Sequence, residues 1–268
     1  MAPSMSSGGK SAARSAQGSK TLELLARAGY AMSGVLHLVI GVLAVQVATG
    51  GASSEEASQT GALAAVAETP GGTGLLWFAV VAFAALGLWQ VTVALSGALE
   101  TSDRLKAAGK AVVYVALGVL AVQVVSGASS GSGQEESFTA RLMQSPGGAL
   151  LVGAVGVGIV VVGVYHVVKG WKKKFLEDLR GGTSGHVGRA VVRLGQVGYI
   201  AKGIALGVLG GLFVVAAVQN DPEQAGGLDA AFATIVAQPF GVVLLVAIGL
   251  GFAAYGLYSF ARARYARM

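Results

Sequence analysis

The hexapeptide Gly-Val-Leu-Ala-Val-Gln fills Gly41–Gln46 and recurs unchanged at Gly118–Gln123, 77 residues further along the chain. Just upstream, Gly29–Gly34 reads Gly-Tyr-Ala-Met-Ser-Gly and is matched by Gly-Tyr-Ile-Ala-Lys-Gly at Gly198–Gly203, a shift of 169. Each copy lies in a long apolar stretch. Repetition at a fixed spacing is typical of a chain built from copies of one structural unit.

A second apolar stretch follows each copy and carries its own repeated signature. It opens after a proline, at Pro70-Gly71, Pro146-Gly147 and Pro239-Phe240-Gly241. It closes on glycine, an aliphatic residue and an aromatic ring, at Gly87-Leu88-Trp89, Gly163-Val164-Tyr165 and Gly256-Leu257-Tyr258. The first and third copies are again 169 residues apart, so one register relates both stretches. We therefore predict three tandem two-helix repeats, at residues 26–98, 106–180 and 193–268, after a basic, disordered tail at residues 1–25.

The composition indicates that these helices lie in lipid. The 268 residues are 54% hydrophobic and only 12% charged, whereas soluble domains carry about 25% charged residues. A spanning helix needs about 20 mostly apolar residues, and six stretches supply them: roughly Tyr30–Ala48, Leu75–Leu95, Ala107–Val125, Ala149–Val168, Gln196–Val218 and Phe240–Phe260. The predicted fold is an all-α integral membrane protein with six transmembrane helices. Because each repeat contributes an even number of spans, we expect a pseudo-threefold arrangement about the membrane normal.

Basic residues gather at alternate connections. The N-terminal segment, the second and fourth connections with their adjoining helix ends, and the C-terminus hold every lysine and arginine except Arg141 and Lys202. The other three connections hold eight acidic residues: Glu55, Glu56, Glu68, Glu135, Glu136, Asp221, Glu223 and Asp229. Basic loops stay in the cytoplasm, so we predict a bacterial plasma-membrane protein with both termini inside. Lys202 lies within the fifth span, and its flexible stem is expected to reach the headgroups.

The net charge of +6 is thus an orientation signal and does not indicate nucleic-acid binding. We expect the chain to meet anionic headgroups through the basic surface residues Lys169, Lys172, Lys173 and Lys174, at about 1 kcal/mol each. With Phe175 and Leu176 they form an amphipathic cytoplasmic extension, for which docking of a partner is the alternative. Three apolar outer stretches, at Ala62–Glu68, Phe138–Gln144 and Leu228–Ala237, are expected to lie among the headgroups.

The repeated motifs resemble those of a known family. The Gly-Tyr-x-x-x-Gly opening, the Gly-Val-Leu-Ala-Val segment, the Pro-Gly turn, the glycine-aliphatic-aromatic close and the lysine-rich run into Phe175–Leu179 are similar to domain of unknown function 1206, a bacterial and mainly actinobacterial membrane family. The resemblance covers about residues 26–267. It implies the three-repeat architecture and an inner-membrane location. It implies no activity and no catalytic residue.

Small residues recur every four positions on three of the predicted spans: Gly203, Gly207 and Gly211 on the fifth, Ala154 and Gly158 on the fourth, and Gly249 and Ala253 on the sixth. Such faces let helix backbones approach closely in lipid. We expect them to pack helices within the molecule, and a surface between subunits is the alternative.

Four polar residues are candidates for an intramembrane site. His37 lies in the middle of the first span, where the register places Tyr114 in the second repeat. His166 lies near the end of the fourth span and matches Gln90. Ionisable residues inside a membrane mark functional sites by default. The alternative is a neutral imidazole hydrogen-bonded across helices, because the spans contain no carboxylate to act as a relay partner.

The chain has no cysteine, which excludes disulfides and thiolate sites. We recognise no metal-ligand set, nucleophile with its base, or phosphate loop, so we expect no metal, no cofactor and no enzymatic activity. The leading hypothesis is a non-enzymatic structural or accessory subunit, associated with another membrane protein or with itself. The alternative is a channel or transporter for small solutes or lipid. A haem protein using His37 ranks last, because one histidine is a weak signal.

Overall fold

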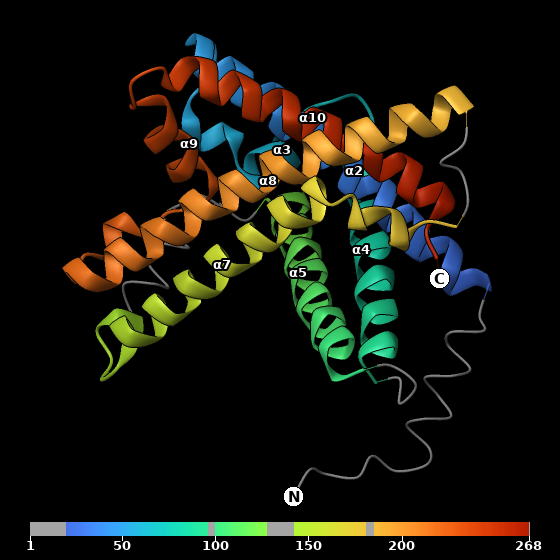
Figure 1. Ribbon diagram of the computed structural model, residues 1–268, viewed down its shortest axis with the longest axis horizontal. Coiled ribbons are helices and arrows are strands. Elements are labelled where there is room, and N and C mark those ends of the chain that lie inside the picture. Colours follow the sequence, from blue (N-terminus) through green and yellow to red (C-terminus); the bar gives the residue numbers. More distant parts are fainter. Residues whose placement is uncertain (1–19, 96–99, 128–141, 181–184, 268) are drawn as a thin grey trace, which may run out of the picture.

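The computed structural model describes residues 20–95, 100–127, 142–180 and 185–267, which form helices and connections without a named strand. Its six long helices are α2 (Lys20–Thr49), α4 (Gly72–Leu95), α5 (Thr101–Val125), α7 (Gly148–Trp171), α8 (Gly185–Gln219) and α10 (Gly241–Tyr265) (Figure 1). Shorter pieces are η1 (Ser54–Ala57), α3 (Gln59–Ala67), η2 (Lys174–Asp178), η3 (Pro222–Gln224) and α9 (Leu228–Val236). All six long helices are long and apolar enough to cross a membrane.

All the long helices except α4 extend beyond the predicted spans at their basic ends. Of the predicted tail, residues 1–19 lie outside the described part of the chain, and residues 20–25 form the first turns of α2. Glu23 and Arg27 make an ion pair of 2.8 Å one turn apart, a spacing that supports a helix. The long apolar spans therefore continue as helix into the polar residues that flank them.

The repeated Pro-Gly signature forms the same turn in all three repeats. The residue before the returning helix is left-handed each time, at Gly71 (φ +80°), Gly147 (φ +79°) and Phe240 (φ +62°). The next residue is always glycine, because a Cβ there would strike the backbone oxygen of the preceding outer segment: Gly72 against Val66, Gly148 against Leu142 and Gly241 against Ile235. The signature thus encodes a close backbone crossing.

The closest helix pairs join neighbouring repeats. The second helix of each repeat packs on the first helix of the next, giving α4 with α5 and α7 with α8, and α10 of the third repeat packs on α2 of the first. Within repeats, α2 packs on α4 and α8 on α10, whereas α5 and α7 share no comparable interface in the part of the chain described. The order of the pairs is cyclic, but the pseudo-threefold arrangement itself stays a prediction.

Glycine faces glycine in two of these three pairs. A Cβ added to Gly41 of α2 would lie 2.6 Å from the Gly249 oxygen of α10. A Cβ on Gly210 of α8 would lie 2.6 Å from the Gly156 oxygen of α7. Seven residues along each helix the contact recurs, between Gly34 and Gly256 and between Gly163 and Gly203. The helices are therefore held by direct backbone contact, as small-residue packing in lipid predicts.

This arrangement corrects the predicted four-residue glycine faces. Gly203, Gly249 and Ala253 do lie at close helix contacts. Gly207 does too, because a Cβ on Gly163 would lie 2.9 Å from the Gly207 nitrogen. A Cβ on Gly211 or Gly158 would meet nothing within 4 Å, and Ala154 and Gly158 are exposed. The physical reason is that two helical turns take about 7.2 residues, so residues seven apart return to the same contact line.

The second repeat lacks the glycine that joins the two helices of the others. A Cβ on Gly29 would lie 2.7 Å from the Ala82 oxygen of α4, and one on Gly198 would lie 2.6 Å from Tyr255 of α10. At the equivalent position of α5 stands Lys106, exposed and 2.9 Å from Asp103. A lysine cannot make this backbone contact, which explains why α5 and α7 do not pack on each other.

The short outer helices lie inside the bundle. Leu63 of α3 and Phe232 of α9 are fully buried and join a core with Leu36, Ile40 and Leu245. The apolar sides of α3 and α9 therefore face the long helices, and the expectation that these segments lie at the depth of the headgroups stays a prediction. In the predicted stretch Phe138–Gln144, residues 138–141 lie outside the part of the chain that the structure describes.

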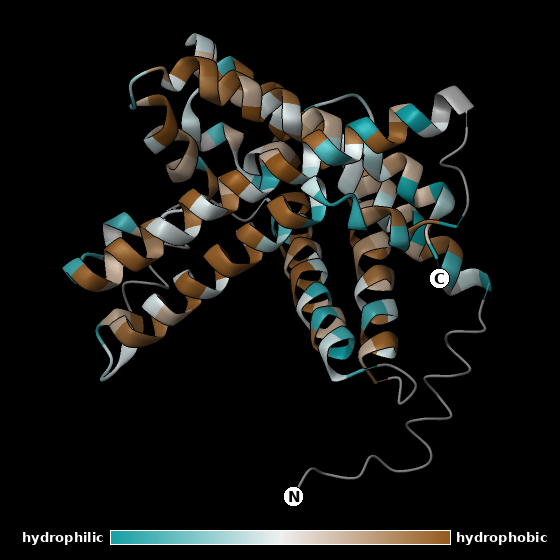
Figure 2. Ribbon diagram, in the orientation of Figure 1, coloured by the Kyte–Doolittle hydropathy of each residue, from teal (hydrophilic) through white to brown (hydrophobic). Residues whose placement is uncertain are grey.

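The ribbons of the long helices are mostly coloured as hydrophobic (Figure 2), and many of their large apolar residues are exposed. On α5 they include Val112, 70% exposed, and on α7 Leu150, 80% exposed. Water would make such surfaces costly, at about 25 cal/mol per Å², whereas lipid tails solvate them. The chain is accordingly a multi-pass membrane protein.

Candidate functional site

Both described ends of the chain meet at one end of the bundle, called here the basic end and defined by Arg27, Lys169, Asp178 and Arg262. Arg27 of α2 donates hydrogen bonds to the Ala263 oxygen (2.9 Å) and the Ala266 oxygen (3.1 Å) of the last turn of α10 and the residue after it. These carbonyls have no partner within their own helix. The arginine therefore ties the start of the first repeat to the end of the third.

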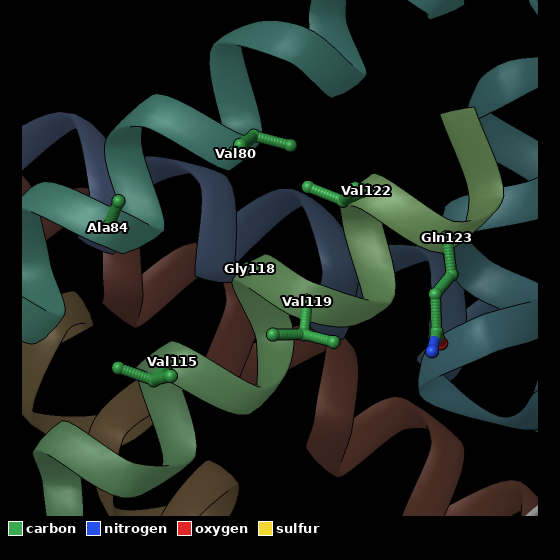
Figure 3. Close-up of a pocket in the computed structure, with 7 residues that line it drawn as sticks. All are labelled: Val80, Ala84, Val115, Gly118, Val119, Val122 and Gln123. Carbon is green, nitrogen blue, oxygen red and sulfur yellow. The ribbon is translucent and has the colours of Figure 1, made fainter. Parts of the chain in front are cut away.

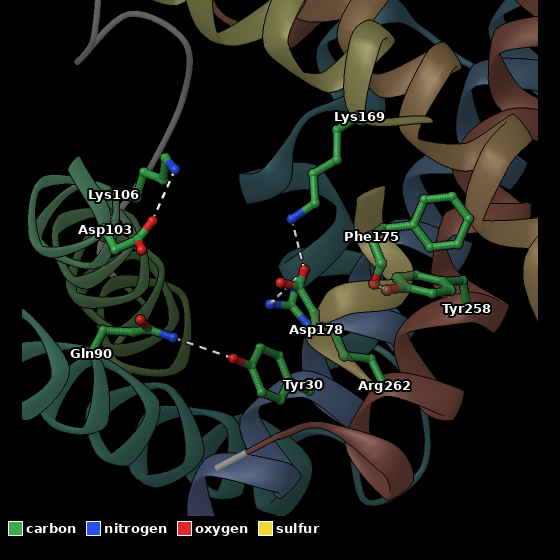
Figure 4. A network of polar contacts seen from close by, with 9 residues as sticks. All are labelled: Tyr30, Gln90, Asp103, Lys106, Lys169, Phe175, Asp178, Tyr258 and Arg262. Carbon is green, nitrogen blue, oxygen red and sulfur yellow. Dashed lines mark hydrogen bonds and ion pairs between the residues drawn. The ribbon is translucent and has the colours of Figure 1, made fainter. Parts of the chain in front are cut away.

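A buried ion-pair cluster lies at the basic end (Figure 4). Lys169 of α7 places Nζ 2.7 Å from Oδ2 of Asp178, and Arg262 of α10 places Nη2 3.9 Å from the same oxygen. Burial alone would raise the pKa of Asp178, but the positive charges of Arg262 and Lys169 outweigh it and hold this pKa below its usual value. Asp178 is thus an ionised bridge between α7 and α10.

The segment that carries Asp178 is fixed across the end of α10. Phe175 is fully buried, and its carbonyl accepts a hydrogen bond from the Tyr258 hydroxyl at 3.3 Å. The Arg180 N–H donates to the Tyr265 oxygen at 2.6 Å. The predicted amphipathic extension therefore packs on the protein, and residues 172–180 are called here the strap.

Two cations of this cluster occupy equivalent repeat positions. Lys169 ends the second helix of repeat 2, and Arg262 ends that of repeat 3, 93 residues later. Arg262 covers the ring of Tyr30 at 4.4 Å from the ring centre, and Lys169 lies 5.4 Å from the centre of Tyr199. Tyr30 and Tyr199 are themselves related by the shift of 169. The α2–α10 and α7–α8 pairs thus share one tyrosine–cation contact.

The third pair has lost this contact. The register places Val93 of α4 and Ala107 of α5 at the cation and tyrosine positions. It also places Val80 and Ala111 where the other pairs have glycine. A cavity of about 300 Å³ lies between α4 and α5, lined by Val80, Ala84, Val115, Gly118, Val119, Val122 and Gln123 (Figure 3). Its lining is almost wholly apolar, so it offers no chemistry beyond space for hydrocarbon.

His37 and Lys202 form a pair inside the bundle. Lys202 Nζ of α8 lies 2.9 Å from His37 Nε2 of α2, and it covers the ring of Tyr255 at 4.7 Å. His37 Nδ1 lies 2.7 Å from the Ser33 oxygen. Because a carbonyl only accepts, Nδ1 carries the proton, and Nε2 accepts from the ammonium. The expectation that Lys202 reaches the headgroups is wrong, because a hydrogen-bond acceptor and an aromatic face hold it inside.

The four predicted polar residues fall into two neighbouring groups. The His37 ring lies tilted against Tyr255, with ring centres 4.7 Å apart. His166 stacks on Tyr199 at 5.6 Å, and the two tyrosines are in edge contact at 5.2 Å. His166 also bonds the Val162 oxygen of its own helix at 2.8 Å.

Gln90 and Tyr114 instead meet at Tyr30. Gln90 is buried and donates to the Tyr30 hydroxyl at 3.2 Å. Tyr114 lies edge-on to the Tyr30 ring, with centres 6.2 Å apart. Arg262 covers the same Tyr30 ring. Both groups of polar residues therefore lie beside aromatic rings and cations near the basic end.

The basic surface prediction needs one correction. Lys172, Lys173 and Lys174 are exposed, as headgroup contact requires. Lys169 is 7% exposed and paired with Asp178, so it is not a surface residue. Spacing along the helix explains the difference, because Lys169 lies one turn before the strap and points beneath it.

Metal-ligating side chains do not gather in groups of three or more anywhere in the described residues. Sequence reasoning missed Arg262, Asp178 and Tyr30 as members of one cluster. The available signal was the repeat register, which aligns Arg262 with Lys169 and Tyr30 with Tyr199. Nothing in the register indicates Asp178, whose position depends on the fold of the strap.

The family model for the Domain of Unknown Function (DUF1206) matches this chain three times, at residues 28–97, 105–173 and 197–266. The chain belongs to this family. An uncharacterized protein of Bacillus subtilis (strain 168), YxxB, is 26% identical over 253 residues, covering 90% of each chain. No solved structure matches the chain. The three DUF1206 matches confirm the three-repeat organisation predicted from the motifs.

Proposed function

We propose that this DUF1206 protein is a non-enzymatic structural or accessory subunit of a bacterial plasma membrane, with both termini in the cytoplasm. One observation carries the proposal: direct glycine contacts bring two helix pairs into backbone contact, while α5 and α7 do not cover each other's apolar faces. Helix pairs that pack through small residues are suited to assembly, and the uncovered apolar faces of α5 and α7 are suited to contact with a partner protein. The partner class is a membrane protein or a second copy.

A bulky substitution on α5 tests this role. Val112 of α5 and Val243 of α10 are each 70% exposed. We therefore expect the surrounding lipid to accommodate a tryptophan side chain equally well at either position. We expect a stoichiometric partner, copurified in mild detergent, to be lost with Val112→Trp and retained with Val243→Trp. Repeated purification of a lone chain, or equal retention by both variants, would contradict the proposal.

A transporter of small solutes is the second candidate, and the His37–Lys202 pair favours it. Ionisable groups inside a bundle often line transport pathways. Proteoliposomes containing the protein would then show solute or proton flux above empty vesicles, and Lys202→Met would abolish it. Flux equal to that of empty vesicles would exclude this candidate and leave the accessory role.

A further inference from the structure

Arg262 is a buried cation with one hydrogen-bond donor, Nε, that the described residues do not satisfy. Its side chain is 9% exposed, and its Nε has no hydrogen-bond partner among the described residues. The Asp178 oxygen at 3.9 Å lies beyond the 2.7–2.9 Å typical of a charge-assisted hydrogen bond. A guanidinium carries five N–H donors, and leaving donors buried and unpaired is costly. The Arg262 guanidinium can therefore donate a hydrogen bond to an acceptor from outside the chain.

Positive charge is in excess around it. Lys169 and Arg262 share the single carboxylate of Asp178. Lys110 of α5, half-buried, interacts electrostatically with Arg262, Asp178 and Lys169. Two cations thus share one carboxylate and Lys110 adds further positive charge, so an anionic group would balance the surplus. Arginine and lysine together are the side chains that bind phosphate groups.

The helices that flank this cluster offer a route from the bilayer. Lys110 comes from α5 and Lys169 from α7, the two long helices of repeat 2 that do not pack on each other. Val112 of α5 and Val164 of α7 are exposed apolar residues close to these lysines in sequence. Exposed Lys172 to Lys174 follow at the end of α7, where they attract anionic lipid.

We propose that an anionic phospholipid binds between α5 and α7, with its phosphate group held by Arg262, Lys110 and Lys169. Its acyl chains lie along the apolar faces of the two helices. A phosphate oxygen supplies the acceptor that Nε of Arg262 lacks, and the negative charge offsets the surplus of cations. This site goes beyond the accessory role and does not depend on it.

Native mass spectrometry of the full chain, delipidated and titrated with phosphatidylglycerol or phosphatidylcholine, tests the site. Loss of a hydrogen bond to a charged group costs about 1.5–3 kcal/mol, so we expect Arg262→Gln to weaken phosphatidylglycerol binding about tenfold or more. Arg264→Gln is the matched control, since it removes the same charge two residues further along α10 at an exposed position. It should bind as the unaltered chain does.

Two further variants cover a failure of Arg262→Gln to fold. Arg262→Lys keeps the charge but loses the planar donor fork, and Lys110→Gln removes a half-buried cation; both should weaken binding several-fold. Equal binding by Arg262→Gln and Arg264→Gln would overturn the proposal. So would equal binding of phosphatidylcholine, or stabilisation of the protein by inorganic phosphate that matches that of phosphatidylglycerol.

Discussion

At the scale of single residues, two buried contacts distinguish this protein from a plain apolar bundle. The His37–Lys202 bond is set by local backbone chemistry, because the Ser33 carbonyl fixes the imidazole proton on Nδ1. The Asp178 bridge is set by distant segments, because Lys169 and Arg262 come from different repeats. Each contact makes a separate prediction.

Replacing His37 should destabilise the protein because Lys202 loses its hydrogen-bond partner. His37→Leu leaves the ammonium without its hydrogen-bond acceptor, which should lower the free energy of unfolding by about 1–3 kcal/mol. Lys202→Met in the same chain removes the unpaired charge and should restore most of that loss. Unfolding in mixed micelles measures all three variants as a double-mutant cycle. Additive losses would show that the two side chains do not interact.

Asp178 makes stability depend on pH in the acid range. Its pKa is held below the usual value of about 3.9 by Arg262 and Lys169, against the opposing effect of burial. The stabilisation is therefore complete above about pH 4 and lost as the pH falls through the lowered pKa. Thermal unfolding in detergent should show Asp178→Asn less stable than the unaltered chain at pH 7, by about 1–3 kcal/mol.

That difference should narrow as the pH falls below about 4 and through the lowered pKa of Asp178, because protonation removes the charge of the carboxyl. Glu177→Gln is the control, since Glu177 is exposed on the same strap and should leave the profile unchanged. A gap between Asp178→Asn and the unaltered chain that stays constant with pH would contradict the ionised bridge.

At the scale of helices, glycines at matching repeat positions bring helices into contact, and the helices of repeat 2 lack some of these glycines. Glycines seven apart join α2 to α10 and α7 to α8. Val80 and Ala111 replace two of them between α4 and α5, where the cavity lies. Lys106 replaces the glycine that would join α5 to α7. Substitutions at a few small-residue positions therefore account for which helices touch.

Neighbouring glycines of α8 should differ sharply in their tolerance of a methyl group. A Cβ on Gly210 would lie 2.6 Å from the Gly156 oxygen and 2.7 Å from the Val160 nitrogen, whereas one on Gly211 meets nothing within 4 Å. Gly210→Ala should destabilise the protein by about 1–3 kcal/mol through overpacking. Gly211→Ala should be neutral or stabilising by up to about 1 kcal/mol. Equal melting temperatures for the two variants in detergent would refute the assigned contact line.

At the scale of the whole molecule, the helix pairs follow a cyclic order and basic residues gather at alternate connections. The first helix of repeat 1 and the last helix of repeat 3 lie side by side (Figure 1), joined through Arg27. This closure places both described ends at the basic end. The three Pro-Gly-type turns lie at the opposite ends of the long helices.

The absence of native cysteine makes this arrangement directly testable. Lys173 of the basic end and Gln238 of the third turn are both exposed. If basic loops face the cytoplasm, a membrane-impermeant thiol reagent applied to intact cells should label Gln238→Cys and spare Lys173→Cys. Permeabilised cells, in which both should react, provide the control. The reverse pattern would invert the proposed orientation.

The sequence by itself determined the six spans, the three repeats and the turn between the helices of each repeat. These depend on local properties: apolar length, recurring motifs, and a glycine where backbone crosses backbone. Pairing of the glycine faces, the inward direction of Lys202 and the convergence of Lys169, Asp178 and Arg262 were decided only by tertiary structure. The physical reason is that one helix sequence is compatible with several facing partners, and a buried charge takes its partner from whichever segment the fold brings beside it.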